Sequence, residues 1–236
     1  MIKALSVSDL SLSIGGAKIL DGISLSVNQN EVLGIIGPNG AGKTSFFNLL
    51  SGVRKPTRGE IHIGEQDVTH MKPYERANVG LARTFQTSSI FANLTCLENV
   101  RIAAQAANGK SMNLTKNAYK FSDVVAHAHE CLTKVGLGPR AIQLAGSLSH
   151  GDKRRLEIAI VLASKSEIVL LDEPMAGMSV ENVPELVEII RSLKVDHHKT
   201  VLIVEHHLEV ILGLADRIAV LNYGELLVCD SPQNVI

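Results

Sequence analysis

The stretch "EVLGIIGPNGAGKT" (31–44) decides the fold of this chain of 236 residues. Residues 31–36 form a short apolar run, which is typical of a strand buried inside a parallel sheet. "GPNGAGKT" (37–44) fits the pattern G-x-x-x-x-G-K-[ST], and "TSFFNLLSG" (44–52) predicts a helix that ends at Gly52. Because this pattern needs a strand before it and a helix after it, the sequence predicts a phosphate-binding loop within an α/β fold.

Each residue type in this loop has its own task at a nucleotide. Gly37, Gly40 and Gly42 let backbone N–H groups wrap around a β-phosphate. Lys43 supplies positive charge to the β- and γ-phosphate oxygens, and the Thr44 hydroxyl is a ligand for Mg²⁺. The predicted nucleotide-binding residues of the loop are Gly37, Pro38, Asn39, Gly40, Ala41, Gly42, Lys43, Thr44 and Ser45.

Two adjacent carboxylates follow a second buried strand, predicted within "EIVLLDEP" (167–174). Asp172 is predicted to hold Mg²⁺ through a water molecule. Glu173 points differently and is predicted to act as the general base toward an attacking water. Acids at strand ends are common, so this pattern alone is weak, and it is the phosphate-binding loop that favours the catalytic interpretation.

A helix with an anion-binding N-terminus is predicted within "GSLSHGDKRRLEIAIVLA" (146–163). Ser149 can cap this helix, and Asp152 lies three residues later, at the position where a capping box has an acidic residue. Gly151 lets another group come close to the backbone. The positive end of the helix dipole therefore predicts a second phosphate site, one without a lysine of the phosphate-loop kind.

The rest of the chain alternates strands with helices, which predicts a mostly parallel sheet with helices on both faces. Residues 87–147 differ in character, and we interpret them as a helical insertion between two halves of the core. The other predicted elements are strands over 4–14, 23–27 and 200–207, hairpins over 59–68 and 217–229, and helices over 122–137 and around 181–195, the last with Pro184 in its first turn.

Composition excludes several classes of protein. The net charge is −1 and the charges are dispersed, which argues against binding nucleic acid, and we interpret Arg154 and Arg155 as a solvated or interface face. Cys96, Cys131 and Cys229 have no metal-site spacing and indicate a reducing compartment. The N-terminus has no signal-peptide pattern, and no apolar run approaches a membrane span, so we expect a soluble protein that reaches membranes only through a partner.

Several motifs resemble those of ABC-type ATPases. "LSHGDKRRLEIA" resembles their signature motif, usually written LSGGQ, and lies ahead of the Walker B strand as in that family. "ARTFQ" ends in Gln86, which matches the Q-loop glutamine, and "VEHH" contains His206, which matches the switch histidine. "AGMS" (176–179) falls on the D-loop. The resemblance covers nearly the whole chain.

This resemblance implies a P-loop NTPase (RecA-like) core with an N-terminal antiparallel β subdomain and an inserted helical subdomain. Residues 1–86 and 156–236 would form the core, and residues 87–155 the helical subdomain. ATP and Mg²⁺ would be bound, with Gln86 sensing Mg²⁺ or water and His206 contacting the γ-phosphate. In this family the nucleotide lies between two cassettes, so Ser149 and Gly151 would touch the γ-phosphate of a partner's ATP.

The sequence between the motifs, mainly residues 59–100 and 173–179, is most similar to ATP-binding subunits of branched-chain amino acid importers. The subunits of urea and amide importers are nearly as similar. The implied partners are membrane permease subunits, a second cassette (the same chain or a sister), and indirectly a solute-binding protein, but no nucleic acid. The chain would lie on the cytoplasmic face of the membrane. Two alternatives stay open, namely a soluble non-transport ABC ATPase and a small-molecule P-loop kinase, which would lack the signature helix.

Four positions depart from the family pattern. His150 replaces the first signature glycine, and Asp152 replaces the glutamine, so we expect Asp152 to cap its own helix and stay off the phosphate. Ser179 stands where the D-loop often has Asp or Asn. Ile14 stands where an aromatic residue often faces adenine, which predicts weak discrimination between ATP and GTP. The end at "SPQNVI" (231–236) leads us to expect a missing tail.

Overall fold

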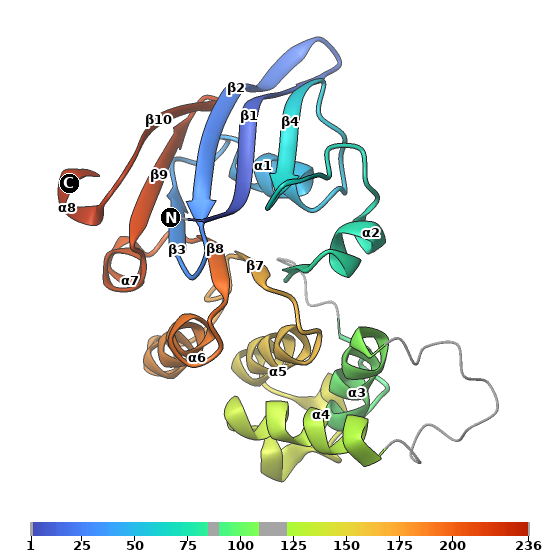
Figure 1. Ribbon diagram of the computed structural model, residues 1–236. Helices are drawn as coiled ribbons and strands as arrows, with labels where there is room; N and C mark the ends of the chain where they lie inside the picture. The colour runs from blue at the N-terminus through green and yellow to red at the C-terminus, as the bar shows by residue number, and fades with distance from the viewer. Residues whose placement is uncertain (1, 85–89, 109–121, 236) are drawn as a thin grey trace. The chain divides into compact units, whose positions relative to one another are not determined.

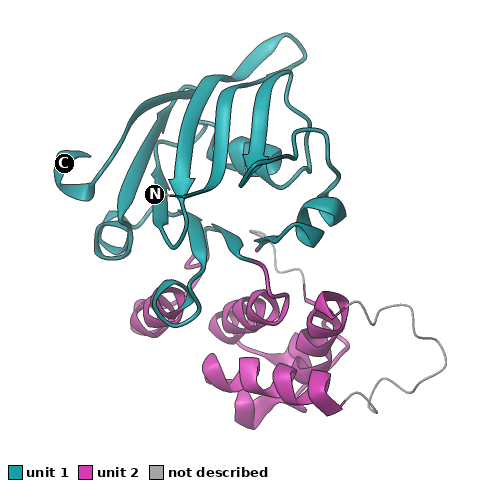
Figure 2. Ribbon diagram, viewed as in Figure 1, with its two compact units in different colours: residues 1–83, 167–173, 193–236 teal, residues 84–166, 174–192 magenta. Residues whose placement is uncertain are grey.

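The computed structural model describes residues 2–84, 90–108 and 122–235 (Figure 1). The chain divides into two compact units, coloured separately in Figure 2. The first unit comprises residues 1–83, 167–173 and 193–236, and the second comprises residues 84–166 and 174–192. The division at 1–86, 87–155 and 156–236 expected from the sequence stays a prediction.

The first unit contains an antiparallel sheet with the strand order β2-β1-β4-β5. Apolar residues alternate with polar ones along much of β1, so that Val7 is buried while its neighbours Ser6 and Ser8 are not. The predicted N-terminal strands and first hairpin are therefore confirmed. The bounds are β1 (Lys3–Ile14), β2 (Ala17–Asn28), β4 (Arg58–Ile63) and β5 (Gln66–Asp67).

A second sheet of the same unit has the order β10-β9-β3-β8-β7-β6. All its pairs are parallel except β9 with β10, which form the predicted last hairpin. The central strands β7 and β8 are buried along their whole length, as their continuous apolar runs predicted. The bounds are β3 (Val32–Ile36), β6 (Leu81–Arg83), β7 (Ile168–Asp172), β8 (Thr200–Val204), β9 (Arg217–Asn222) and β10 (Glu225–Asp230).

Helix α1 (Lys43–Leu50) packs in the core between these two sheets. Phe46 and Phe47 are fully buried there, together with residues of β1 and β2 and of β3 and β8. Burying one such side chain contributes about 1.5–3 kcal/mol, so the core holds α1 firmly in place. The other helices that begin in this unit are α2 (Pro73–Asn78), α7 (Leu208–Leu214) and α8 (Pro232–Val235).

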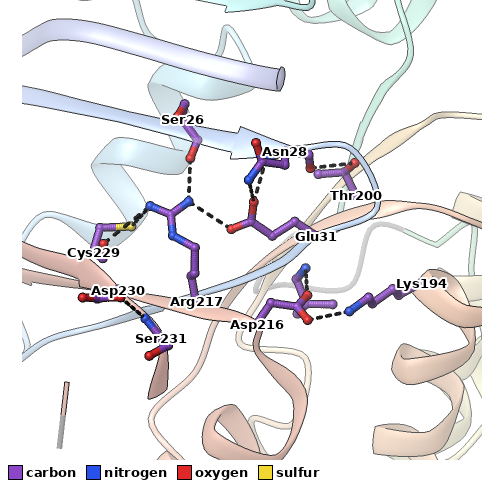
Figure 3. Close-up of polar contacts among 11 residues, drawn as sticks. Ser26, Asn28, Glu31, Lys194, Thr200, Asp216, Arg217, Cys229, Asp230 and Ser231 are labelled. Carbon is purple, nitrogen blue, oxygen red and sulfur yellow. Dashed lines mark hydrogen bonds and ion pairs between the residues drawn. The ribbon is translucent and has the colours of Figure 1, made fainter. Parts of the chain in front are cut away.

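A network of polar side chains ties the turn between β2 and β3 to strands β9 and β10 (Figure 3). Arg217 Nη1 donates to the Ser26 carbonyl oxygen and to Glu31 Oε1, both over 3.1 Å. Its Nη2 donates to Cys229 Sγ over 3.0 Å. Glu31 Oε2 accepts from the backbone N–H and the side chain of Asn28, so the mostly buried carboxylate is satisfied.

The second unit is helical. Thr95 caps α3 (Cys96–Ala107) in a capping box with Glu98, and α3 packs against α4 (Ser122–Lys134) and α5 (His150–Ala163). Helix α6 (Val183–Val195) carries Pro184 as its second residue, which confirms the predicted helix. Within the described residues, no helix has both the length and the apolar character that crossing a membrane requires.

Candidate functional site

The glycine-rich loop joins the end of β3 to the start of α1. Gly37 has φ +149° and Gly42 has φ +100°, and a Cβ at Gly37 would collide with the Leu221 carbonyl oxygen. Glycine is therefore required at both positions. Pro38, Asn39 and Gly40 are exposed, which leaves the loop open to a ligand.

The start of α1 suits an anion. Among the described side chains none caps this helix, and its first turn carries no acid. The first backbone N–H groups of any helix have no partner inside it, and they lie at the positive end of the helix dipole. The loop and the helix start together therefore fit a phosphate, and its binding by residues 37–45 stays a prediction.

Lys43 is the first residue of α1, and its side chain folds back onto the loop. Its Nζ donates to the carbonyl oxygens of Gly37 at 2.7 Å and Pro38 at 3.0 Å. Burial lowers the pKa of the Lys43 ammonium, and the nearby carboxylates of Glu173 and Asp172 partly oppose this. The ammonium is thus held against the loop, where a phosphate would meet it.

Asp172 ends β7 and is only 1% exposed. Its Oδ2 accepts a hydrogen bond of 2.8 Å from Arg83 Nη2, in an ion pair whose side chains are both nearly inaccessible. Asp172 pairs in parallel with Val204 of β8, which places it at the carboxyl edge of the sheet. The predicted metal carboxylate and the phosphate loop therefore share one edge of one sheet.

Glu173 and His206 are brought together by neighbouring strands. Glu173 Oε1 lies 2.9 Å from His206 Nε2, and the Glu173 backbone N–H donates to the Val204 carbonyl oxygen over 2.9 Å. Glu173 has φ +47°, a strained conformation for a residue with a side chain. Such strain concentrates at functional sites, where the fold holds a side chain in a set direction.

The oxygen donors present fit Mg²⁺. Thr44 is exposed at the start of α1, and Asp172 supplies a carboxylate at the same sheet edge. The described part of the chain holds no group of three or more His, Cys, Asp or Glu side chains suited to a metal. Mg²⁺ commonly takes one or two protein oxygens plus phosphates and waters, so a hydroxyl and one carboxylate suffice. Gln86, also predicted as a metal ligand and catalytic residue, lies outside the described residues.

The start of α5, in the second unit, has the expected N-cap. Ser149 Oγ accepts from the Asp152 backbone N–H over 3.1 Å and donates to Asp152 Oδ2 over 2.8 Å. Arg140 pairs with the same Oδ2, and Arg155 Nη1 lies 3.8 Å from Oδ1. The Asp152 side chain is thus turned toward its own helix, as expected from the sequence. It is also turned toward two arginines, which the sequence did not predict.

Gly151 and its neighbours meet the segment 176–179. A Cβ at Gly151 would lie 3.4 Å from Met178 Cε, and one at Gly177 would lie 3.3 Å from His150 Nε2. Ser179 Oγ accepts from Asn182 over 2.7 Å, within the second unit. Ser149 and His150 remain exposed, so the start of α5 is open to a group from outside.

The structure corrects the interpretation of one arginine and adds another arginine to the site. Arg154 is 4% exposed and donates to the buried Glu157 over 2.9 Å, so the expected solvated face is wrong for this residue. The spacing of three residues between Arg154 and Glu157 in "RRLE" is the signal for this pair. Arg83 was not predicted as a site residue, because nothing in "ARTF" indicates that it pairs with Asp172, 89 residues away. Ile14 is 42% exposed, and its place against adenine stays a prediction.

Known proteins resemble the chain along most of its length. The family model described as "ABC transporter" matches residues 20–176. The chain is 36% identical to the high-affinity branched-chain amino acid transport ATP-binding protein LivG of Salmonella typhimurium, over 98% of this chain and 92% of LivG. It is 34% identical to BraF of Pseudomonas aeruginosa, which has the same description, over the same shares.

Solved structures show the same fold. The ADP conformation of MJ1267, an ATP-binding cassette of an ABC transporter, has a TM-score of 0.87 and 29% identity, over 100% of this chain and 95% of that one. A nucleotide-free ATP-binding cassette from an ABC transporter has a TM-score of 0.86 and 28% identity, over 99% and 94%. With the family match, the phosphate loop and the carboxylates beside it, the chain belongs to the ABC transporter family as an ATP-binding cassette.

Proposed function

We propose that this chain is the ATP-binding and ATP-hydrolysing subunit of an importer for branched-chain amino acids. The observation that carries the proposal is the pairing of Glu173 with His206 next to a phosphate loop in which Gly37 and Gly42 leave no room for a side chain. The similarity to LivG and BraF over nearly the whole chain supports amino acids as the cargo. Urea or amide import is the alternative left open by the sequence.

Each predicted site residue has a separate role in binding or hydrolysing ATP. The loop amides and Lys43 hold the phosphates, while Thr44 and Asp172 hold Mg²⁺, with Gln86 as its further ligand. Mg²⁺, when bound, neutralises charge on the β- and γ-phosphates. Glu173 takes a proton from the attacking water, and His206 orients that carboxylate and contacts the γ-phosphate. The products are ADP and inorganic phosphate.

Exchange of Glu173 for glutamine tests the proposed chemistry. Glu173→Gln keeps the shape of the side chain but cannot accept the proton, so we expect ATP hydrolysis to fall about 10²–10⁴-fold. The affinity for ATP should stay within about twofold, measured by calorimetry. Glu209→Gln, on the exposed start of α7, is the matched control and should hydrolyse ATP at the parent rate. Equal rates in the two variants would remove Glu173 from the mechanism.

We also propose that the chain works with permease subunits on the cytoplasmic face of the membrane, and that a solute-binding protein delivers the cargo to them. Residues 87–155 would form the subdomain that meets the permease. Uptake of labelled leucine by cells with and without this chain tests the cargo. Loss of leucine uptake with urea uptake intact would support the proposal, and the reverse would favour the urea importer.

A further inference from the structure

Arg83 is the last residue of β6, and its guanidinium lies beside the carboxylate predicted to hold Mg²⁺. Its Nη2 donates to Asp172 Oδ2 over 2.8 Å, and the two side chains are 5% and 1% exposed. Arg83 pairs in parallel with Leu170, two residues before Asp172 and therefore on the same face of β7. The contact thus follows from the strand register, and solvent screens it little.

The other half of the guanidinium is anchored to α1. Arg83 Nη1 donates to Asn48 Oδ1 and to Ser51 Oγ, each over 2.8 Å. The guanidinium also lies over the ring of Phe47, 5.8 Å from its centroid. Because α1 begins at Lys43, one planar group links the helix of the phosphate loop to the strand that carries Asp172.

We propose that Arg83 is a positioning residue that fixes the Asp172 carboxylate for Mg²⁺ bound with nucleotide. Holding one oxygen fixes the plane of the carboxylate, and so the directions in which it can accept from a metal or its water. A carboxylate without that support would sample other orientations and bind the ion less tightly. The same guanidinium holds Asp172 at a fixed position relative to α1. That helix carries Thr44, the other predicted protein ligand of Mg²⁺ among the described residues. This inference rests on the proposed ATP site.

A purely electrostatic role for Arg83 predicts the opposite result. A guanidinium beside a cation repels it, so removing that charge would by itself tighten metal binding. Positioning predicts weaker binding when the guanidinium is removed. The direction of the change in metal affinity therefore separates the two roles.

The experiment measures Mn²⁺ affinity of the protein with ATP by electron paramagnetic resonance of the free ion. Arg83→Met removes the charge and the planar fork, whereas Arg83→Lys keeps the charge and loses the fork. Arg217→Met is the matched control, because it removes another arginine that pairs with a buried carboxylate, Glu31, in the same unit. Binding of ATP in EDTA is measured in parallel by calorimetry.

We expect the Mn²⁺ dissociation constant to rise at least tenfold in Arg83→Met and by a smaller factor in Arg83→Lys. ATP binding in EDTA should stay within twofold, and the control should match the parent in both. An unchanged or tighter Mn²⁺ affinity in Arg83→Met would overturn the inference, as would an equal loss of metal-free ATP binding. A parent protein that binds no ATP would instead reject the proposed function.

A second variant decides the question if Arg83→Met does not fold. Exchange of both Asn48 and Ser51 for alanine removes two acceptors of the guanidinium and leaves the ion pair with Asp172 in place. We expect the Mn²⁺ dissociation constant to rise at least threefold, with metal-free ATP binding unchanged. A change smaller than that would count against a positioning role for Arg83.

Discussion

Asp152 illustrates how one residue can depart from a family pattern and still suit the fold. An acid near a triphosphate is unfavourable, yet its Oδ2 is engaged by the Ser149 hydroxyl and by Arg140. Asp152 is buried, at 8% exposure for the residue, and its carboxylate takes part in the N-terminal cap of α5. Its charge is thereby compensated before any phosphate approaches.

Exchange of this residue for the family's glutamine should cost stability without a gain in rate. Asp152→Gln loses charge-assisted hydrogen bonds worth about 1.5–3 kcal/mol, so we expect the melting temperature to fall by about 3–10 °C. ATP hydrolysis should stay at or below the parent rate. Differential scanning fluorimetry and a phosphate-release assay measure the two. The exposed Asp196→Gln is the control and should change neither. A many-fold faster Asp152→Gln would show that the acid opposes the phosphate.

Helix α1 depends on an arginine at its end as well as on glycines at its start. Arg76 of α2 is 1% exposed and donates through Nη1 to the carbonyl oxygens of Leu49 at 2.5 Å and Leu50 at 2.6 Å. Its Nη2 donates to the Thr69 carbonyl oxygen at 2.9 Å. Burial lowers the pKa of Arg76 to about 10, so the guanidinium stays charged at neutral pH. It therefore satisfies the last-turn carbonyls of the phosphate-loop helix.

Removing this cap should destabilise the first unit strongly. Arg76→Met removes a charged donor from three buried carbonyl oxygens, of which that of Leu49 keeps the Gly52 N–H. We therefore expect a loss of about 3–5 kcal/mol in the free energy of unfolding, measured by urea denaturation. Arg58→Met removes an exposed ion pair with Asp9 and should cost less than about 1 kcal/mol. Equal losses in the two variants would mean that the cap adds nothing beyond a surface pair.

Features that depend on a short stretch of sequence could be predicted. Features that depend on contacts between distant residues could not. The loop at 37–44 directly follows β3, and the acids at 172–173 stand at the end of the buried β7, so the local sequence alone locates them. Arg76 and Arg83 act on partners 27 and 89 residues away. The sequence around an isolated arginine does not reveal its hydrogen-bond acceptor, because strand register and helix packing determine which acceptor lies nearby.

At the scale of the whole molecule, the predicted phosphate contacts are split between the two units. The first unit carries the loop, Asp172, Glu173 and His206, while the second carries Ser149 at the exposed start of α5. A helix start contributes only about 0.3–2 kcal/mol toward an anion. Two such contacts made across a pair of chains would still favour a dimer that ATP completes and hydrolysis weakens, since ATP would bind the paired chains better than a single chain.

This arrangement predicts that ATP doubles the mass of the Glu173→Gln protein in solution, as measured by light scattering. Adding Ser149→Asp keeps a good N-cap but sets a negative charge where the partner's γ-phosphate would lie, so this double variant should stay monomeric with ATP bound. Adding Ser149→Asn instead keeps the cap without the charge and should still double. If Glu173→Gln stays monomeric with ATP bound, pairing requires a sister cassette or the permease. If both double variants dimerise, α5 does not face the nucleotide of the second chain.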